Sequence, residues 1–354
     1  MMKAFFVEFP AKDQCVLSSE ELPPLKPDQI LIKSDYSLIS AGTELANYHA
    51  LPNTGGGNGD FPMRIGYSTS GHVLEVGQDV QNFRPGDKVA VTWGGHRSHM
   101  VCNASTAYRV PDDLQSIKNS IAQIVAKIPD GIDMRDACFV NVATFPMLGV
   151  RKLELQMGES VMIAGLGLLG MLAVQYAKLS GACPVMACDY SPERRALALQ
   201  MGADVVLDPA APDFYDQIKA WTDGTGPDAV VEVTGFIPAL QQALEYIAFE
   251  GRISLLGCTR VSDQTIDFYK YVHRRGIKLI GAHTCARPNV ESRPGEWTQW
   301  DDVRTFFRYL QTGRMQVAPL RTRLVSPRDC GAVYHEIGSM KNPPFGNVFD
   351  WTDF

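Results

Sequence analysis

The sequence lacks the features that mark membrane, secreted and nucleic-acid-binding proteins. No apolar run approaches the ~20 residues needed to cross a bilayer, so we expect no membrane-spanning segment. The N-terminus, MMKAFFVEFP, holds a shorter apolar stretch than a secretory signal requires, and Glu8 interrupts it. Basic residues form no stripe, and 33 Lys and Arg stand against 39 Asp and Glu, for a formal net charge of −6. This balance argues against a nucleic-acid partner.

Paired cysteine spacings are also missing. The eight cysteines include no C-x-x-C pair; they are Cys15, Cys102, Cys138, Cys183, Cys188, Cys258, Cys285 and Cys330. Scattered thiols in a chain of 354 residues are more typical of a reducing compartment than of a disulfide framework. We therefore expect a cytoplasmic protein that is long enough to bury its own core without covalent staples.

The length favours two domains, at roughly 100–200 residues each. Residues 1–110 are expected to be β-rich, because Pro, Gly and Asp separate the short apolar segments KAFFVEF, QILIKSDYSLI, GHVLEVG and KVAVTW. This pattern predicts a barrel or a sandwich. The Gly-rich stretch at 52–60 is predicted to be a loop, for which two interpretations stay open: a tolerated surface insertion, or a lid at the rim of a cleft.

The pattern changes near residue 112. Helical spacing predicts helices over 116–128 and 137–153, and apolar strands then alternate with amphipathic helices between residues 160 and 283. This alternation predicts a doubly wound parallel sheet, and the near-continuous Val, Ile and Leu of the strands suit burial on both faces. A helix at 301–313 and a strand at 347–351 are expected to return to the N-terminal domain.

The segment SVMIAGLGLLG holds the most informative motif, a G-x-G-x-x-G that follows a predicted strand and opens a predicted helix. Gly165 would permit a tight turn, Gly167 the close approach of a pyrophosphate, and Gly170 close packing of helix on strand. The first helical turn, which begins with Leu168 and Leu169, would present free N–H groups and the positive end of the helix dipole to phosphates. The alternative is an ordinary strand–helix turn, and the context favours a dinucleotide site.

An acidic residue stands where such a site needs one. Asp189 ends the next predicted strand, 19 residues after the motif, at the position of a carboxylate that binds the ribose hydroxyls. A 2′-phosphate there would meet negative charge, so we predict NAD(H) rather than NADP(H), although the nearby Arg194 and Arg195 weaken this inference. Thr234 and Gly257, at later strand ends, either frame the nicotinamide half of the cofactor or are plain turn residues.

The segments GHVLEVGQDVQNFRPGDKVAV, AGLGLLG and MGADVVLD together resemble the medium-chain dehydrogenase/reductase superfamily, and the resemblance covers nearly the whole chain. It implies an α/β fold with two parts. Residues 1–142 and 290–354 would form a β-rich, GroES-like barrel domain, and residues 143–289 a Rossmann domain with a doubly wound parallel sheet. Members of the superfamily are commonly dimers or tetramers, which implies a homo-oligomer here.

The zinc-dependent members hold their catalytic metal with a Cys-Gly-Thr-Asp-type motif, a Gly-His-Glu motif, and a Cys or Glu before the nucleotide domain. Here Ala41 takes the first ligand position, Tyr67 and Ser68 replace the His-Glu pair, and Asn141 lies at the third position. Because catalytic zinc takes about three Cys, His, Asp or Glu ligands, the resemblance implies a zinc-free branch. The segments SLISAGTE and IGYSTSG are similar to those of bacteriochlorophyllide dehydrogenases and bacterial sugar-type oxidoreductases. The four-cysteine lobe that binds structural zinc is also missing, since only Cys102 lies in that region.

Without zinc, a side chain must handle the proton that accompanies the hydride. Tyr67 is the leading candidate, as a general acid or a hydrogen-bond donor to the substrate oxygen, and the alternative is a packed strand residue. Thr43 matches the hydroxyl residue that begins a proton relay in the zinc relatives, and His49 could replace the relay histidine, whose place Ala46 occupies. Glu44 either holds other residues of the site in place without touching the substrate, or binds substrate hydroxyls directly.

Three further positions have open roles. Trp93 either lines the substrate pocket as an aromatic wall or belongs to the barrel core. His283, with Arg287 after it, follows the last predicted strand of the nucleotide domain and is expected to contact substrate or cofactor. His96 and His99 are predicted to point to opposite faces of a strand, which disfavours a metal site between them.

The sequence thus predicts NAD(H)-linked, zinc-independent interconversion of a secondary alcohol and a ketone, on a sugar- or cyclitol-like small molecule. Two alternatives stay open: reduction of an activated C=C bond, as in quinone and enoyl reductases of the superfamily, and NAD binding without turnover. Asp189 counts against the first, since those reductases usually prefer NADPH. The retained Thr43, Glu44 and Tyr67 count against the second.

Overall fold

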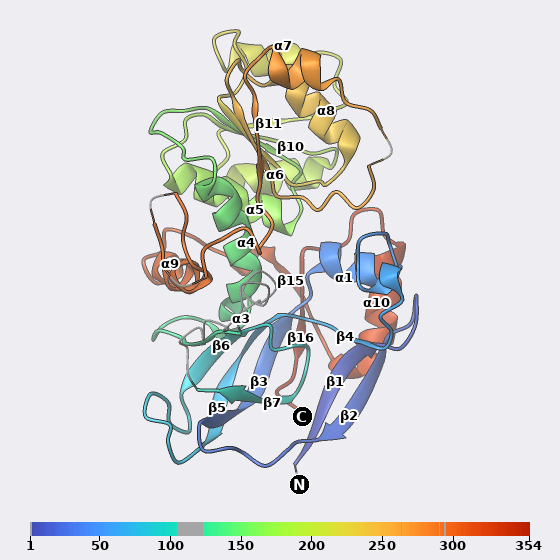
Figure 1. The fold of residues 1–354 in the computed structure, drawn as a ribbon, viewed down its shortest axis with the longest axis vertical. Helices are drawn as coiled ribbons and strands as arrows, with labels where there is room; N and C mark the ends of the chain where they lie inside the picture. Colours follow the sequence, from blue (N-terminus) through green and yellow to red (C-terminus); the bar gives the residue numbers. More distant parts are fainter. Residues whose placement is uncertain (1, 105–122, 263, 290, 294) are drawn as a thin grey trace. The chain divides into compact units, whose positions relative to one another are not determined.

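The structure, a computed structural model, describes residues 2–104, 123–262, 264–289, 291–293 and 295–354 (Figure 1). The chain forms two compact units: unit 1 is Met1–Val142 with Val303–Phe354, and unit 2 is Ala143–Asp302. The sequence assigned the segment just before Val303 to the N-terminal domain, but it lies in unit 2, because Asp302 is bound there by Arg151 and Arg287.

Unit 1 is β-rich, as predicted. Its described strands are β1 (Lys3–Phe9), β2 (Val16–Glu21), β3 (Gln29–Leu38), β4 (Met63–Arg64), β5 (Ser68–Val76), β6 (Lys88–Thr92), β7 (His99–Asn103), β8 (Val125–Lys127), β15 (Arg321–Val325) and β16 (Gly346–Asp350). One sheet has the order β2-β1-β4, and the other has the order β15-β16-β3-β5-β6-β8, with β7 paired to β3. The four predicted segments form β1, β3, β5 and β6, and the predicted final strand forms β16.

One helix prediction is wrong where the structure describes it. Residues 116–128 were predicted to be helical, but Val125–Lys127 form strand β8, which pairs antiparallel with β6. The backbone of this segment pairs with strand β6 of the sheet. The Val125 side chain joins a buried cluster with Ile30, Val89 and Val91. Tertiary pairing therefore overrides the local helical spacing. The rest of the predicted helix, up to residue 122, lies outside the described residues.

The helices of unit 1 lie in two places. They include α1 (Ala41–Tyr48), α3 (Met134–Ala137) and α10 (Cys330–Ser339), with one-turn helices at Gly56–Asn58, Ala318–Leu320 and Pro327–Asp329. Helix α10 contacts the smaller sheet at β2, and α3 contacts the larger sheet at β3 and β5. Helices α1 and α10 lie side by side (Figure 1) and bury a cluster that includes Phe9, Tyr334 and Trp351. The Gly-rich stretch 52–60 is a compact turn fixed to α1, because the Gly56 N–H donates to Asn47 Oδ1 at 3.2 Å.

Unit 2 contains the predicted doubly wound sheet. In its described part, the strands are β9 (Val161–Ala164), β10 (Val185–Cys188), β11 (Val205–Leu207), β12 (Ala229–Glu232), β13 (Arg252–Leu255) and β14 (Lys278–Gly281). They are all parallel, in the order β11-β10-β9-β12-β13-β14. The helices are α4 (Val140–Arg151), α5 (Leu168–Leu179), α6 (Pro192–Gln200), α7 (Phe214–Ala220), α8 (Ile237–Tyr246) and α9 (Gln299–Gln311), with one turn at Tyr269–His273. The unit boundaries fall inside α4 and α9.

The core of unit 2 follows the two-residue period of its strands. Met162 and Ala164 of β9 face the same side as Phe214 of α7 and Leu240 of α8, and these residues form one buried cluster. Every residue of β9, β10 and β12 is buried, so both faces of the sheet are covered there, and the carboxyl ends of these strands are left to carry polar residues. None of the helices in the described ranges is long and apolar enough to span a membrane.

Candidate active site

The glycine loop of unit 2 has the geometry that its motif requires. Gly165 adopts a left-handed φ of +99°, and a Cβ there would lie 2.7 Å from Thr234 Cγ2. A Cβ on Gly170 would lie 2.0 Å from the Gly165 carbonyl oxygen, so α5 packs directly on the turn. A Cβ on Gly167 would meet nothing within 4 Å. The backbone around Gly167 is therefore open to a ligand, next to the N-terminus of α5 that begins with Leu168 and Leu169.

The Asp189 carboxylate stands beside this loop. Its Oδ2 accepts a hydrogen bond from the Leu166 N–H at 2.8 Å, and its Oδ1 accepts one from the Ser191 N–H at 2.9 Å. The Arg194 guanidinium lies 3.9 Å from Oδ2. The Arg195 guanidinium does not bind the Asp189 carboxylate in this way. It pairs with Asp208 and donates to the backbone carbonyl of Asp189. Asp189 is therefore held in place at the carboxyl end of β10, and Arg194 is the cation beside it.

Two other predicted cofactor residues prove to pack the strand ends together. The Thr234 methyl lies under Gly165, while its N–H donates to the Glu232 carboxylate at 2.7 Å. A Cβ on Gly257 would come within 2.3 Å of the Gly235 nitrogen, so the ends of β12 and β13 touch at this point. Burial raises the pKa of Glu232, against the hydrogen bonds that it accepts from Thr234 and Gly235. These residues shape the edge of the sheet on which the glycine loop rests.

In unit 1, Glu44 is the centre of a buried polar network. The residue is 2% exposed, and its Oε1 accepts a hydrogen bond from the Ser40 N–H at 2.9 Å. Its Oε2 lies 3.1 Å from His96 Nε2 and accepts a hydrogen bond from the Tyr334 hydroxyl. The other ring nitrogen of His96 lies 2.7 Å from Ser37 Oγ. This placement favours the supporting role that was one of the two predictions for Glu44.

The structure does not bring Thr43 and His49 together. Thr43 lies in the first turn of α1, whereas His49 caps its C-terminal end. Six residues along a helix correspond to a rise of about 9 Å. His49 Nδ1 lies 2.7 Å from Asp13 Oδ1, and its ring packs against Gly338 of α10. His49 is thus tied to Asp13 rather than directed toward Thr43.

Tyr67 and Trp93 do come together. Their ring centres are 5.1 Å apart, and the backbone N–H of Trp93 donates to the backbone carbonyl of Tyr67 at 2.9 Å. Trp93 has a left-handed φ of +58°, an uncommon backbone state for a bulky residue, and such states gather at functional sites. Tyr67 is 7% exposed. Asn141 fixes the same strand end, because its Nδ2 donates to the Tyr67 carbonyl at 2.8 Å.

This donor set does not fit a catalytic zinc ion. Of the three positions at which the resemblance places ligands, Ala41 has no side-chain donor atom, Tyr67 carries a phenol within an aromatic pair, and Asn141 uses its amide nitrogen on a backbone carbonyl. His96 and His99 do not form a pair, since His96 binds Glu44 and Ser37 while His99 Nδ1 lies 3.1 Å from Ser98 Oγ. No group of three potential metal ligands was found among the described residues.

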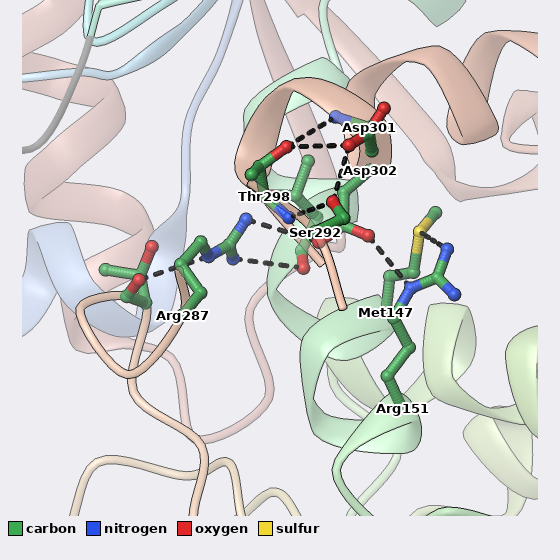
Figure 2. Close-up of polar contacts among 9 residues, drawn as sticks. Met147, Arg151, Arg287, Ser292, Thr298, Asp301 and Asp302 are labelled. Carbon is green, nitrogen blue, oxygen red and sulfur yellow. Dashed lines mark hydrogen bonds and ion pairs between the residues drawn. The ribbon is translucent and has the colours of Figure 1, made fainter. Parts of the chain in front are cut away.

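The segment after β14 carries His283 and Arg287, and the structure gives them different environments. His283 is exposed; its Nδ1 accepts a hydrogen bond from the Cys285 N–H at 3.3 Å. Partial burial, and next the charges of Arg260 and Arg287, lower the pKa of His283. Arg287 is instead buried, with a side chain only 3% exposed, and it bridges Asp302 at 3.3 Å and the Thr144 carbonyl at 3.4 Å (Figure 2).

Sequence reasoning missed the partners that hold these residues. Tyr334 lies 290 positions from Glu44, and no local pattern links the two. His96 was weighed only as a metal ligand, although a histidine after two glycines, between strands, could have signalled a buried hydrogen-bond partner. The sequence predicts only that Asp302 lies in a helix at 301–313, whereas the structure shows that it accepts from Arg151 at 2.9 Å and from Arg287 (Figure 2). The sequence signal that could have pointed to these partners is the pair of acidic residues, Asp301 and Asp302, in the first turn of α9.

Comparisons with known proteins agree in placing the chain. The family model for the alcohol dehydrogenase GroES-like domain matches residues 26–116, and that for the zinc-binding dehydrogenase matches residues 169–299. An L-threonine 3-dehydrogenase of Pyrococcus abyssi is 30% identical over 322 residues, 85% of each chain. A D-guloside 3-dehydrogenase of Shigella flexneri is 30% identical over 229 residues, which is 65% of this chain but only 61% of that relative. A Sinorhizobium meliloti structure described as a zinc-binding dehydrogenase bound to NADP superposes with a TM-score of 0.79, at 18% identity, over 99% of this chain and 100% of its own.

Proposed function

This chain belongs to the medium-chain dehydrogenase/reductase superfamily, and from that premise we propose that it is a zinc-independent, NAD(H)-dependent oxidoreductase. Its reaction is the interconversion of a secondary alcohol and a ketone on a sugar- or cyclitol-like small molecule. The observation that carries this proposal is Tyr67, a phenol at a former ligand position, held against Trp93 and fixed through its carbonyl by Asn141.

The cofactor preference rests on Asp189. When it is bound, NAD(H) accepts or donates the hydride. The open backbone at Gly167 and the N-terminus of α5 bind the pyrophosphate, and the Asp189 carboxylate binds the ribose hydroxyls. A 2′-phosphate would meet the charge of this carboxylate, which the Leu166 and Ser191 N–H groups hold in place. Arg194 would favour NADP(H), but its guanidinium already lies 3.9 Å from Asp189 Oδ2.

The proton that accompanies hydride transfer is assigned to Tyr67. Without a Lewis acid, a neutral donor close to the substrate oxygen stabilises the charge that develops on it. Thr43 and Glu44 keep supporting roles, because Glu44 fixes the start of α1 through the Ser40 N–H and thereby positions Thr43. A relay that runs through His49 is disfavoured by its contact with Asp13.

The substrate class rests on two observations. The exposed part of Trp93 offers an aromatic surface, and such surfaces suit the apolar face of a sugar or cyclitol ring. One relative is named a D-guloside 3-dehydrogenase, whose substrate is a sugar derivative with secondary alcohols. His283, which follows β14, is assigned to contact with this substrate.

We further propose that the protein is cytoplasmic and forms a homo-oligomer, either a dimer or a tetramer. Light scattering of the purified protein would test the oligomeric state.

The experiment is a substrate screen with both cofactors. Purified protein is incubated with NAD⁺ or NADP⁺ and a panel of sugars, glycosides, polyols and cyclitols, and formation of the reduced cofactor is followed by absorbance. Turnover with NAD⁺ on a member of this panel is expected. Turnover only with NADPH on quinones or enones would instead establish a C=C reductase. Tight NADH binding with no turnover on any compound would establish a nucleotide-binding protein.

A further inference from the structure

Two cysteines that are far apart in the sequence lie together in unit 1. Cys15 directly precedes β2, and Cys330 is the first residue of α10; both are free thiols. A Cβ placed on Gly331 would lie 2.9 Å from the Cys15 carbonyl oxygen, so the first turn of α10 passes directly beside Cys15. Cys330 belongs to the buried cluster under α10, and Cys15 packs against the same cluster from its edge. The two side chains therefore meet at the rim of a folded core.

The surroundings of Cys15 and Cys330 make the two thiols unequal. The hydrogen bond with Cys330, followed by burial, raises the pKa of Cys15. The same hydrogen bond lowers the pKa of Cys330, and the backbone N–H groups of Gly331 and Cys330 at the start of α10 lower it further. Cys330 is thus the thiol that more readily becomes a thiolate, as is typical of cysteines at helix N-termini, and Cys15 keeps the proton.

The other cysteines lack this combination. Cys102, Cys138 and Cys188 are buried, and burial raises the pKa of all three thiols, so they are chemically quiet. Cys183, Cys258 and Cys285 are exposed thiols, and the cysteine nearest to any of them in the sequence, Cys188, is buried. A pair with one activated thiol and one adjacent thiol is the arrangement from which intramolecular disulfides form.

We propose that Cys15 and Cys330 form a reversible disulfide when a small peroxide oxidises the protein. The Cys330 thiolate attacks the peroxide oxygen, which breaks the O–O bond, leaves a sulfenic acid on Cys330 and releases an alcohol or water once protonated. The Cys15 sulfur then displaces the hydroxyl of the sulfenic acid; the S–S bond forms, and the hydroxyl leaves as water with the proton of Cys15. Two thiols and one hydrogen peroxide thus give one disulfide and two waters, and two equivalents of a small thiol reverse the reaction.

The position of this pair ties it to the polar network of unit 1. Tyr334 lies one turn after Cys330 on the same face of α10, and its hydroxyl donates to Glu44. A bond from Cys15 to the first turn of α10 constrains the helix that carries this contact. The inference concerns the thiols alone and does not depend on the proposed dehydrogenase activity.

The test is thiol mapping after treatment with hydrogen peroxide, which is small enough to reach Cys330, a residue only 2% exposed. After alkylation of the remaining thiols, non-reducing peptide mass spectrometry should find the peptides of Cys15 and Cys330 joined in most molecules. Dithiothreitol should separate them. Cys258→Ser, which removes an exposed thiol, is the matched control and should leave this cross-link unchanged.

Two variants test the assigned roles by trapping sulfenic acid with dimedone. In Cys15→Ser the adduct should accumulate on Cys330, because no thiol is left to resolve it. In Cys330→Ser no adduct should form on Cys15. The proposal is overturned if the oxidised wild-type protein keeps Cys15 and Cys330 as free thiols while Cys258 and Cys285 are modified. An adduct on Cys15 in Cys330→Ser would overturn the assignment of Cys330 as the attacking thiol.

Discussion

Glu44 and His96 face each other inside unit 1, with Oε2 and Nε2 3.1 Å apart and with side chains that are only 3% and 0% exposed. Each of the two residues is held by a further polar group: Tyr334 donates to Glu44, and Ser37 contacts His96. Burial, and next the charge of Glu44, raise the pKa of Tyr334 well above its ordinary range, so the phenol stays a donor. The network fastens α1 to the sheet and to α10.

Removal of the Glu44 carboxylate should therefore destabilise unit 1. In Glu44→Ala, His96 and Tyr334 both lose their shared partner in the interior, and each buried polar group left without its partner costs about 1–3 kcal/mol. Tyr334→Phe deletes a single donor and should cost less, about 1–3 kcal/mol. Urea denaturation of the three proteins gives the ranking. A Glu44→Ala protein with the wild-type midpoint would show that the network does not stabilise the fold.

Tyr67→Phe should lower kcat by about 10²–10⁴-fold, the usual effect of losing a general acid. The affinity for NADH should hardly change, because only a hydroxyl in unit 1 is removed and the glycine loop belongs to unit 2. Steady-state kinetics and NADH fluorescence titration measure the two effects separately.

His49→Ala is the matched control for this prediction, since His49 is the competing proton donor and is held by Asp13. It should keep most of the activity. If Tyr67→Phe retained more than half of kcat while His49→Ala lost most of it, the proton would run through the relay. If both variants stayed active, the proton would come from water, and Tyr67 would be only a wall of the pocket.

The wild-type protein should bind NADH far more tightly than NADPH, by roughly 10²-fold for a difference of a few kcal/mol. Asp189→Asn should narrow this gap, because it removes the charge but keeps an acceptor for the Leu166 N–H. Asp189→Ala should weaken both cofactors as well, since the glycine loop also loses its anchor. Fluorescence titrations of the three proteins with both cofactors decide the matter, and equal dissociation constants in the wild-type protein would contradict the assignment.

The sequence predicted most of unit 2, because each of its strands is a continuous apolar run between helices of clear period. It did not predict α1, α10 or β8, whose segments are short and take their structure from what they pack against. Helix α1 begins at Ala41, right after a strand, and its first turn is held by Glu44 from within. Strand β8 forms because its backbone pairs with that of β6. Local propensity decides little in such segments.

The candidate site divides in the same way. The glycine loop could be placed from the sequence because all its residues lie within one turn, and the structure gives each glycine a geometric reason. Glu44, His96 and Tyr334 come from three distant segments, and only the folded chain brings them together. Sequence spacing also placed His49 near Thr43, whereas the helix carries it away to Asp13.

The purified protein should hold far less than one zinc ion per chain, and its activity should survive chelators. The donor set at Ala41, Tyr67 and Asn141 is the reason, since a structural or catalytic zinc needs thiolate, imidazole or carboxylate ligands. Elemental analysis measures the metal content directly, and an assay after dialysis against EDTA measures its importance. Stoichiometric zinc that is lost together with activity would refute the prediction.

The cluster of Arg151, Arg287 and Asp302 should give the stability of unit 2 a specific pH dependence (Figure 2). Burial outweighs the two arginines and raises the pKa of Asp302 from 3.8 to about 6. Between these two values the folded protein binds a proton that the unfolded chain has released. The stability contributed by this group is therefore present at low pH and is lost as the pH rises toward 6, with a slope of at most about 1.4 kcal/mol per pH unit for one proton.

Asp302→Asn removes this titration and should remove its slope. The free energy of unfolding of the wild-type protein minus that of the variant should fall as the pH rises from about 4 to 6, and then level off. Asp301→Asn is the control: Asp301 accepts from the hydroxyls of Ser292 and Thr298 (Figure 2), and its charge adds to the raised pKa of Asp302, so this variant should keep the slope and shift it to lower pH. Thermal unfolding at several pH values supplies the curves. A difference that stays constant from pH 4 to pH 7 would mean that Arg151 and Arg287 keep Asp302 ionised throughout, so that the ion pairs rather than burial decide its charge.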